Sequence, residues 1–457
     1  MLMSLYSAIS GLQAFQQQLD VIGNNVANVN TVGYKEQTVS FSDLLSQTIS
    51  GATGANSATN TGGVNALQVG MGVSVSAIST DMTTGSTQST GNTNDVAISG
   101  NGFFIVQGGT SGTYQFTRSG DFSIDEAGNL TVNGYQVCGW QSYTTDSDGE
   151  AVFNTQKTVE PLNLYSDSVN GNKETIDPQQ TTGASLTGTL SPSDTASGEA
   201  LNDIYAGTAT TLPDEPSATA TVTAYDAQGN SYDIQVKMYK CYTDTTQNIT
   251  SYYWAADPSD AANLALTNAS GYIEFDSNGN MITTDATNYN TAPTITLAPQ
   301  GNYAGSAAFD VTLDFSDISY YTSSTTGIAV SSCDGYAGGY LEDYAIGSDG
   351  VITGIYSNDQ KKVLGMIALA VFSNPSGLAK IGDNLYITTA NSGSFTGGVA
   401  AGSGGTSALT AGALELSNVD LTTQLSEMMI AQRAYQANSK VITTTDDMLD
   451  TLLSLIR

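Results

Sequence analysis

The first thirty residues carry a heptad of apolar residues. They alternate at spacings of three and four, in the order Leu5, Ala8, Leu12, Phe15, Leu19, Ile22, Val26 and Val29. Residues three and four apart share one face of an α-helix, so this pattern predicts a helix with one narrow apolar seam that lies against another helix. Asn28 and Asn30, followed by Gly33, are expected to end that helix.

The C-terminal segment repeats the pattern. Apolar residues recur every seven positions, at Leu414, Leu421, Met428, Tyr435, Ile442, Leu449 and Ile456, and Leu425, Leu452 and Leu453 widen the stripe. Glu415 and Asp420 lie early and Arg457 last, which suits the dipole of a helix. The intervening heptad positions Gln432, Ser439 and Asp446 are polar, so this partner face is broader and wetter. Each stripe could pack on its own globular domain, but two stripes at the two ends favour pairing with each other and with neighbouring copies.

Between the ends, the composition indicates mainly β structure. Residues 46–66 are rich in Ser, Thr, Gly, Asn and Ala and predict a linker or long loop. From about Val69, runs such as Phe103–Gln107 and Val351–Tyr356 alternate with turn signals.

One turn motif recurs between these runs. It appears at 125–129, 226–230, 276–280 and 348–350, where Gly follows an Asx-rich start. Gly supplies a positive φ and Asx side chains satisfy local backbone groups, so these are predicted hairpin turns. A calcium loop is an alternative at Asp146–Glu150, although the full EF-hand spacing is missing.

Charge and composition exclude several classes of function. The chain has 43 acidic and 12 basic residues, a net charge of −31, which argues against nucleic acid or an anionic membrane as partner. Histidine is absent, which removes Ser-His-Asp and Cys-His catalysis and argues against zinc. We therefore expect no enzymatic activity, cofactor or metal.

The sequence also bears on export and on thiol chemistry. No run approaches the ~20 apolar residues of a membrane span. No Lys or Arg precedes Lys35, so the N-terminus does not read as a cleaved secretory signal. Cys138, Cys241 and Cys333 are far apart, and an unpaired Cys most often serves as a small core residue.

Both ends resemble a known family, the bacterial flagellar rod, hook and hook-associated axial proteins. The N-terminal match covers Ser7–Leu12 and Leu19–Lys35, and the C-terminal match covers Met428–Ile442 and Met448–Leu453. Gly100–Val106 and Phe116–Phe122 are similar to segments of the rod and hook members. The hook members are the most similar, through Gly354–Asn358, Leu369–Leu378, Gly382–Tyr386 and Leu414–Asp420.

The resemblance implies a nested architecture. Residues 1–35 and 414–457 would form a helical coiled-coil domain that lines a channel, 36–69 a linker or loop, 70–146 and 333–413 an inner β domain, and 147–332 one or more outer β domains. The chain would be a structural subunit of the flagellar hook, a flexible tube that transmits torque from rod to filament. Its partners would be other copies of itself, the distal rod protein, the hook cap, the hook–filament junction protein and the flagellar type III export apparatus. It would be extracellular, exported without a cleaved signal. Some members of the family link subunits through Cys and Lys, and Cys241 lies beside Lys240.

The predicted polymerisation seam consists of the apolar helix positions Leu5, Leu12, Phe15, Leu19, Ile22, Val26, Leu421, Leu425, Met428, Tyr435, Ile442 and Leu449. Three other functions are alternatives. A distal rod protein would lack the long insertion at 147–332. A secreted β-rich adhesin would need a cleavable signal or an anchor. A hydrolase with paired carboxylates would need a pocket, since 43 acids place some pair at a suitable separation by chance.

Overall fold

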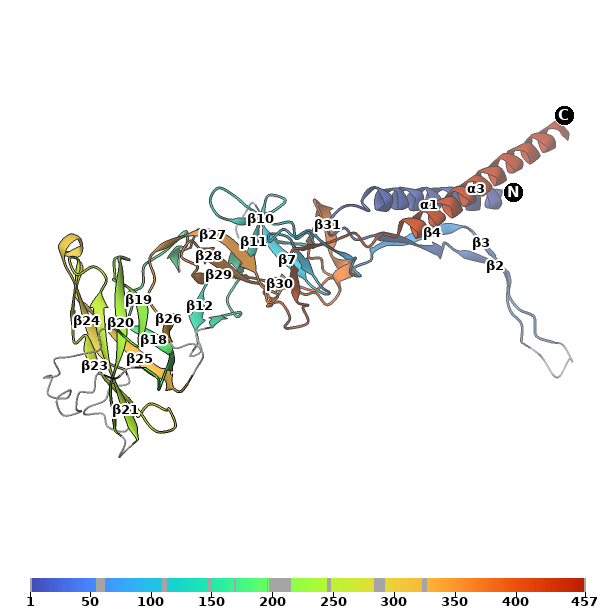
Figure 1. Ribbon diagram of the computed structural model, residues 1–457. Coiled ribbons are helices and arrows are strands. Elements are labelled where there is room, and N and C mark those ends of the chain that lie inside the picture. The colour runs from blue at the N-terminus through green and yellow to red at the C-terminus, as the bar shows by residue number, and fades with distance from the viewer. Residues whose placement is uncertain are drawn as a thin grey trace. The chain divides into compact units, whose positions relative to one another are not determined.

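The fold is mainly β, with one long helix at each end of the part of the chain that the structure describes (Figure 1). This computed structural model describes residues 2–455 apart from 55–61, 109–112, 147–149, 168–169, 195, 197–214, 245–247, 283–291 and 323–326. The predicted fold class is confirmed. Two compact units are present: a terminal unit of residues 1–174, 343–355 and 361–457, and a middle unit of residues 175–342 and 356–360. Residues 150–174 thus belong to the terminal unit, and the domain limits inferred from the sequence stay a prediction.

The two terminal helices are α1 (Leu2–Ala27) and α3 (Leu421–Leu455). The chain leaves α1 through a turn that ends at Gly33, whose φ is +68°, as the Asn and Gly signals predicted. The start of α3 differs from the prediction, because Leu414 and Glu415 lie in strand β34. Asp420 caps the helix: its Oδ1 accepts a hydrogen bond from the Thr422 amide at 2.9 Å.

Small residues let α1 and α3 approach each other closely. The two helices pack together in the terminal unit, and α1 also packs on strands β1 and β4 (Figure 1). Ala8, Gly11 and Ala14 of α1 are buried, and a Cβ atom at Gly11 would lie 2.8 Å from Asn438 Nδ2 of α3. Gly23, by contrast, has no atom within 4 Å of its Cβ position.

The prediction of a linker or loop over 36–69 is wrong for residues 37–43, 46–50 and 67–69, which lie in strands. Strand β1 (Gln37–Asp43) pairs with β4 (Val73–Thr80), and β2 (Ser46–Ser50) pairs with β3 (Leu67–Gly70), both antiparallel. Alternating Val39 and Phe41 and many β-branched residues favour strands here. The linker prediction was based on the high content of Ser, Thr and Gly, which are common in loops, and not on this pattern. Residues 55–61 of this range lie outside the described residues.

The body of the terminal unit is an antiparallel sheet with the order β28-β29-β11-β7-β8-β32-β31. These strands span Val351–Tyr356, Lys361–Ile367, Tyr135–Trp140, Phe103–Gln107, Tyr114–Thr117, Leu385–Ile387 and Ala379–Gly382, respectively. Short strands attach to them: β9 (Ser123–Ile124), β10 (Leu130–Val132), β14 (Glu160–Pro161) and β30 (Leu369–Ala370). The predicted strands Phe103–Gln107 and Val351–Tyr356 are confirmed. Their core includes Phe103, Phe116, Trp140, Phe372 and Tyr386.

Small two-stranded sheets join distant parts of the terminal unit. Strand β5 (Thr87–Ser89) pairs with β34 (Ala413–Glu415), and β6 (Val96–Ile98) pairs with β33 (Leu409–Ala411). The others are β12 (Tyr143–Thr145) with β13 (Ala151–Phe153), and β15 (Ser166–Asp167) with β16 (Gly171–Asn172); η2 spans Pro375–Gly377. The β5–β34 pair holds the chain that leads into α3 against the N-terminal half.

The middle unit is a sandwich of two sheets around one apolar core. One sheet has the order β22-β24-β25-β18-β26, with strands Leu264–Thr267, Thr294–Pro299, Phe309–Tyr320, Gly183–Leu190 and Gly327–Cys333. The other has the order β19-β20-β21-β23, with strands Ala218–Tyr225, Ser231–Asp244, Ile249–Pro258 and Ser270–Phe275. Both contribute to the core, which includes Leu186, Val222, Trp254 and Phe315. Strand β17 (Thr175–Ile176) pairs with residues of β27 (Gly339–Ile346), and η1 spans Gly301–Tyr303.

The four predicted hairpin turns are confirmed. Gly128, Gly229, Gly279 and Gly350 all have φ between +83° and +86°. In the first three turns the initial Asp accepts hydrogen bonds from the two backbone amides that follow at i+2 and i+4. These local bonds help to fix the strand connections.

We expect Gly11→Leu to weaken the helix pair, because the new side chain meets Asn438 at the closest approach of the helices. Overpacking of this kind costs about 1–3 kcal/mol. Gly23→Leu is the matched control, since it adds the same side chain to the same helix in open space and gains helix propensity. Urea unfolding followed by far-ultraviolet circular dichroism measures both. Equal stability of the two variants would contradict the close approach.

Candidate assembly site

A buried ion cluster lies where the two ends of the chain meet the β body. Lys35 Nζ lies 2.7 Å from Glu415 Oε1, and Arg118 Nη1 lies 3.1 Å from Glu415 Oε2. The side chains of Lys35, Arg118 and Glu415 are 0%, 2% and 1% exposed, respectively. They come from the segment after α1, the end of β8 and the strand that precedes α3. One carboxylate therefore ties three distant parts of the terminal unit.

Neighbouring backbone groups also hydrogen-bond to the cluster. Lys35 Nζ donates to the Thr83 carbonyl at 2.6 Å, and the Gly85 amide donates to Glu415 Oε1 at 3.0 Å. Burial lowers the pKa of Lys35, and the adjacent Glu415 carboxylate opposes that shift. The Arg118 guanidinium also lies 5.0 Å from the centre of the Phe103 ring. A buried ion pair that has lost its hydration depends on such partners to remain charged, and among the described residues only Arg118 Nε of this cluster has no hydrogen-bond partner.

Gly33 is required by the same junction. Its amide donates to the Glu415 carbonyl at 2.8 Å, and a Cβ atom there would lie 2.7 Å from the Arg118 carbonyl carbon. With φ at +68°, the position combines a left-handed backbone with a close backbone approach. Only glycine meets both conditions.

A second polar network joins α1 to α3. The fully buried Asn25 of α1 donates through Nδ2 to Gln424 Oε1 of α3 at 3.2 Å and to the Gln37 carbonyl at 2.8 Å. Asn25 Oδ1 accepts from the Gln37 amide at 3.0 Å and from Tyr34 Oη at 3.2 Å. The Asn25–Gln424 bond requires one relative position of the two helices, and the bonds of Asn25 to Gln37 and Tyr34 hold its side chain in place for that contact.

The seam of α1 is largely covered within the single chain. Ile22 is buried, whereas Leu5, Leu12, Phe15, Leu19 and Val26 are half-buried. The Phe15 ring lies 5.7 Å from the ring of Phe41 in β1. In α3, the predicted seam residues Met428, Ile442 and Leu449 are half-buried, on the side that carries Gln424 and Asn438.

Three predicted seam residues of α3 do not face α1. Leu421, Leu425 and Tyr435 are 42%, 48% and 39% exposed. The positions that α3 buries are instead Gln424, Ala431 and Thr445. The structure thus brings together the α1 seam and part of the α3 seam, and leaves the rest of α3 uncovered.

The β2–β3 hairpin exposes a second set of apolar side chains. All described residues of β2 and β3 are exposed, and the apolar ones at or beside the strands are Leu44, Leu45, Ile49, Val64, Leu67, Val69 and Met71. A two-stranded ribbon with both faces in water is only marginally stable.

Several acidic residues lie near Glu36, the residue that follows Lys35 of the buried ion cluster. The pKa of Glu36 is raised by burial and then by the nearby charges of Asp81, Glu427 and Asp420. Within the described ranges, no group of three acidic, His or Cys residues is placed to hold a metal ion. The calcium alternative at Asp146–Glu150 includes 147–149, which lie outside the described residues.

None of the three cysteines forms a disulfide in the described part of the chain. Cys138 and Cys241 are buried and Cys333 is half-buried. Burial raises the pKa of Cys138 to about 12, so this thiol is not reactive at neutral pH. A core role for Cys241 fits its burial, and a covalent link through it stays a prediction. No helix in the described part of the chain is long and apolar enough to cross a membrane.

Sequence reasoning missed the residues that hold the ends together. Lys35 and Glu415 are 380 positions apart, and no local pattern connects them. One signal was available: Lys35 and Arg118 are the first two basic residues of a chain that has only 12. Rare cations in an acidic chain are good candidates for buried ion pairs.

Comparisons with known proteins match both ends and the middle. Family models match residues 5–35 (Flagella basal body rod protein), 97–172 (Flagellar hook protein FlgE/F/G D1 domain), 193–336 (Flagellar basal body protein FlaE D2 domain) and 410–455 (Flagellar basal body rod FlgEFG protein C-terminal). The flagellar hook proteins FlgE of Borreliella burgdorferi and Treponema pallidum are 36% and 37% identical, each over 100% of both chains. That of Salmonella typhimurium is 35% identical over 99% of this chain and 100% of its own. The flagellar basal-body rod protein FlgG of Bacillus subtilis is 29% identical over both full lengths.

We expect Glu415→Gln to destabilise the terminal unit by about 3–5 kcal/mol, because the amide keeps the shape but leaves two buried cations without a counter-charge. Asp257→Asn is the control. It breaks the Lys237–Asp257 pair, whose side chains are 27% and 56% exposed, and should cost about 1 kcal/mol or less. Denaturant unfolding measures both. A small effect of Glu415→Gln would show that the cluster does not hold the junction.

Proposed function

The chain belongs to the flagellar hook protein family, and we propose that it polymerises through its terminal helices and the β2–β3 hairpin. Members of this family are structural proteins, and this chain is a structural subunit of the flagellar hook. The distal rod alternative is less well supported, since the rod relative is 29% identical whereas three of the hook relatives are 35–37% identical. An adhesin is likewise not favoured by these relatives.

The observation that carries the proposal is the uncovered half of the helical seam. Within one chain, α1 covers Met428, Ile442 and Leu449 but leaves Leu421, Leu425 and Tyr435 in water. Burial of a fully exposed Leu side chain stabilises by about 1.5–3 kcal/mol, so half-exposed residues retain roughly 1 kcal/mol each. A neighbouring copy that covers them would gain this free energy. The helical pair thus resembles a helical bundle in which the neighbouring helices that would cover α3 are missing.

The hairpin supplies a second incomplete surface. Its apolar residues lie on a ribbon that no other described strand pairs with beyond β2 and β3. Burying them on a neighbouring copy would remove exposed apolar area and stabilise a ribbon that is marginal alone. We infer that both surfaces contact neighbours in the polymer.

The remaining expectations follow from the family. The tube would transmit torque from rod to filament, with the helical pair near its channel. Partners would be the distal rod protein, the hook cap, the hook–filament junction protein and the flagellar type III export apparatus, with export that leaves the N-terminus uncleaved. The excess negative charge of −31 would keep the outer surfaces of neighbours weakly associated, which suits a flexible tube.

Replacing the uncovered seam should block polymerisation and spare the monomer. We expect the triple variant Leu421→Ser, Leu425→Ser, Tyr435→Ser to raise the critical concentration by roughly a hundredfold, since about 3 kcal/mol of burial is lost. Turbidity and electron microscopy of the purified chain measure this effect. Val152→Ser, at a residue of β13 that is 51% exposed, is the control. Normal polymers from the triple variant would contradict the proposal.

The hairpin is tested separately. Ile49→Asn with Leu67→Asn should reduce polymerisation and leave the unfolding midpoint of the monomer unchanged, because both side chains are more than half exposed in the single chain. Gln47→Asn, on the same ribbon, is the matched polar control. In wild-type polymer the hairpin should also become resistant to limited proteolysis. Cleavage at the same rate in monomer and polymer would argue against a contact.

A further inference from the structure

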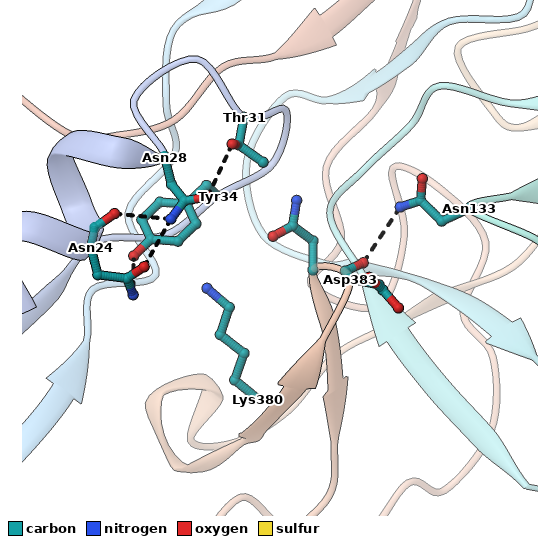
Figure 2. Close-up of a pocket in the computed structure, with 8 residues that line it drawn as sticks. Asn24, Asn28, Thr31, Tyr34, Asn133, Lys380 and Asp383 are labelled. Atoms are coloured by element: carbon teal, nitrogen blue, oxygen red, sulfur yellow. Dashed lines mark hydrogen bonds between the residues drawn. The ribbon is translucent and has the colours of Figure 1, made fainter.

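A polar cavity of about 720 Å³ lies at the base of the helical pair. Its walls come from the last turn of α1 and the turn after it, the β10–β11 turn and the β31–β32 hairpin. All of these belong to the terminal unit. Figure 2 shows Lys380 reaching into this space from the hairpin, toward the ring of Tyr34. The functions described above assign no role to the cavity.

Lys380 is the cation of this cavity. Its Nζ lies 3.9 Å from the centre of the Tyr34 ring, and half-burial lowers its pKa. Among the described residues, no carboxylate lies within ion-pair distance of this ammonium group. Asp383 also lines the cavity, but Figure 2 shows its side chain directed away from Lys380. An ammonium has three donors, and the ring face satisfies the cation only in part.

The amides around Lys380 are fixed by their own hydrogen bonds. Asn384 Nδ2 donates to the Val32 carbonyl at 2.9 Å, and Asn28 Nδ2 donates to the Asn24 carbonyl at 2.9 Å. Asn24 Nδ2 donates to Tyr34 Oη at 3.3 Å. The cavity is therefore a pre-formed polar site with one positive charge. The ligand chemistry that fits it is a carboxylate.

The opposite end of the helical pair carries the complementary charge. At 1.5 Å per residue, the 35 residues of α3 span about 52 Å and the 26 of α1 about 39 Å, so α3 extends beyond its partner. Figure 1 shows the C-terminal end of α3 past the N-terminus of α1. Asp446, Asp447 and Asp450 lie exposed in this last part of α3.

These aspartates are unfavourably placed in a single chain. Asp446 and Asp450 are like charges four residues apart, and both lie toward the negative end of the helix dipole. A cation from outside would relieve both effects. The cavity with Lys380 lies at the other end of the helical pair, so one chain cannot supply this contact to itself.

An open polymer requires contact between two different surfaces of the same chain, because a self-complementary patch closes as a dimer. The two ends of the helical pair meet that requirement. We propose that the Lys380 cavity of one copy binds the aspartates at the end of α3 of the next copy. This inference rests on the proposed function. It adds a polar contact to the apolar contacts, and this polar contact sets the direction of the polymer.

The test is charge reversal in the full chain. Lys380→Glu should raise the critical concentration for polymerisation by roughly tenfold or more, the effect of losing about 1.4 kcal/mol per contact. Lys361→Glu, at an exposed lysine elsewhere in the terminal unit, is the matched control and should polymerise normally. Circular dichroism verifies that both variants are folded. Lys380→Met, which retains contact with Tyr34, should weaken the dependence of polymerisation on salt.

Charge exchange identifies the occupant. Asp446→Lys, Asp447→Lys and Asp450→Lys together should also block polymerisation, and combining them with Lys380→Glu in one chain should restore it. Polymerisation of Lys380→Glu at the concentration that the Lys361→Glu control needs would overturn the inference and leave the apolar contacts intact. Failure of the exchange to restore polymers would overturn the assignment of α3. Failure of the unaltered chain to polymerise would overturn the proposed function as well.

Discussion

The Glu415 carboxylate is the constraint on which the terminal unit depends. It accepts hydrogen bonds from Lys35, Arg118 and the Gly85 amide. The backbone carbonyl of Glu415 also accepts a hydrogen bond from the Gly33 amide. The segments that carry these groups lead into α1 on one side and into α3 on the other. A buried ion pair seldom adds much net stability relative to an apolar core, but it tolerates only one arrangement of its partners. It therefore determines where both helices leave the β body.

The helices themselves are less completely stabilised than their base. Near the body, Asn25 and Gln424 are buried and hydrogen-bonded, whereas the far end of α3 exposes Leu452, Leu453 and Leu455. Helices within proteins gain most of their stability from packing of an apolar face, so this end of α3 has the least support. Such a gradient suits a subunit that must stay soluble as a monomer. Under the proposed function, it would complete its packing when neighbouring copies cover this end.

Sequence reasoning succeeded where the determinant was local. The α1 heptad, its end at the Asn and Gly signals, and the four Asx–Gly turns all depend on residues close in sequence. It failed where a distant partner decided the outcome. Leu414 continues the heptad spacing of α3, yet pairing with β5 makes it a strand residue, and Asp420 starts the helix later. The predicted seam of α3 stays a prediction, but the heptad did not include the polar residues Gln424 and Asn438, which lie opposite Asn25 and Gly11 of α1.

Apolar contacts alone would leave the register of an assembled helical bundle undetermined. A heptad seam that slips by seven residues still places apolar side chains against one another, so its free energy changes little. A buried hydrogen bond or ion pair has no such equivalent position. Within one chain, Asn25 and Gln424 give α1 and α3 a single register. Between chains, Lys380 lies at the base of the helical pair and three aspartates lie near its other end, and this asymmetry would also give the polymer a direction. The leucines would then contribute most of the binding free energy, and the few polar groups would fix the relative position of the helices.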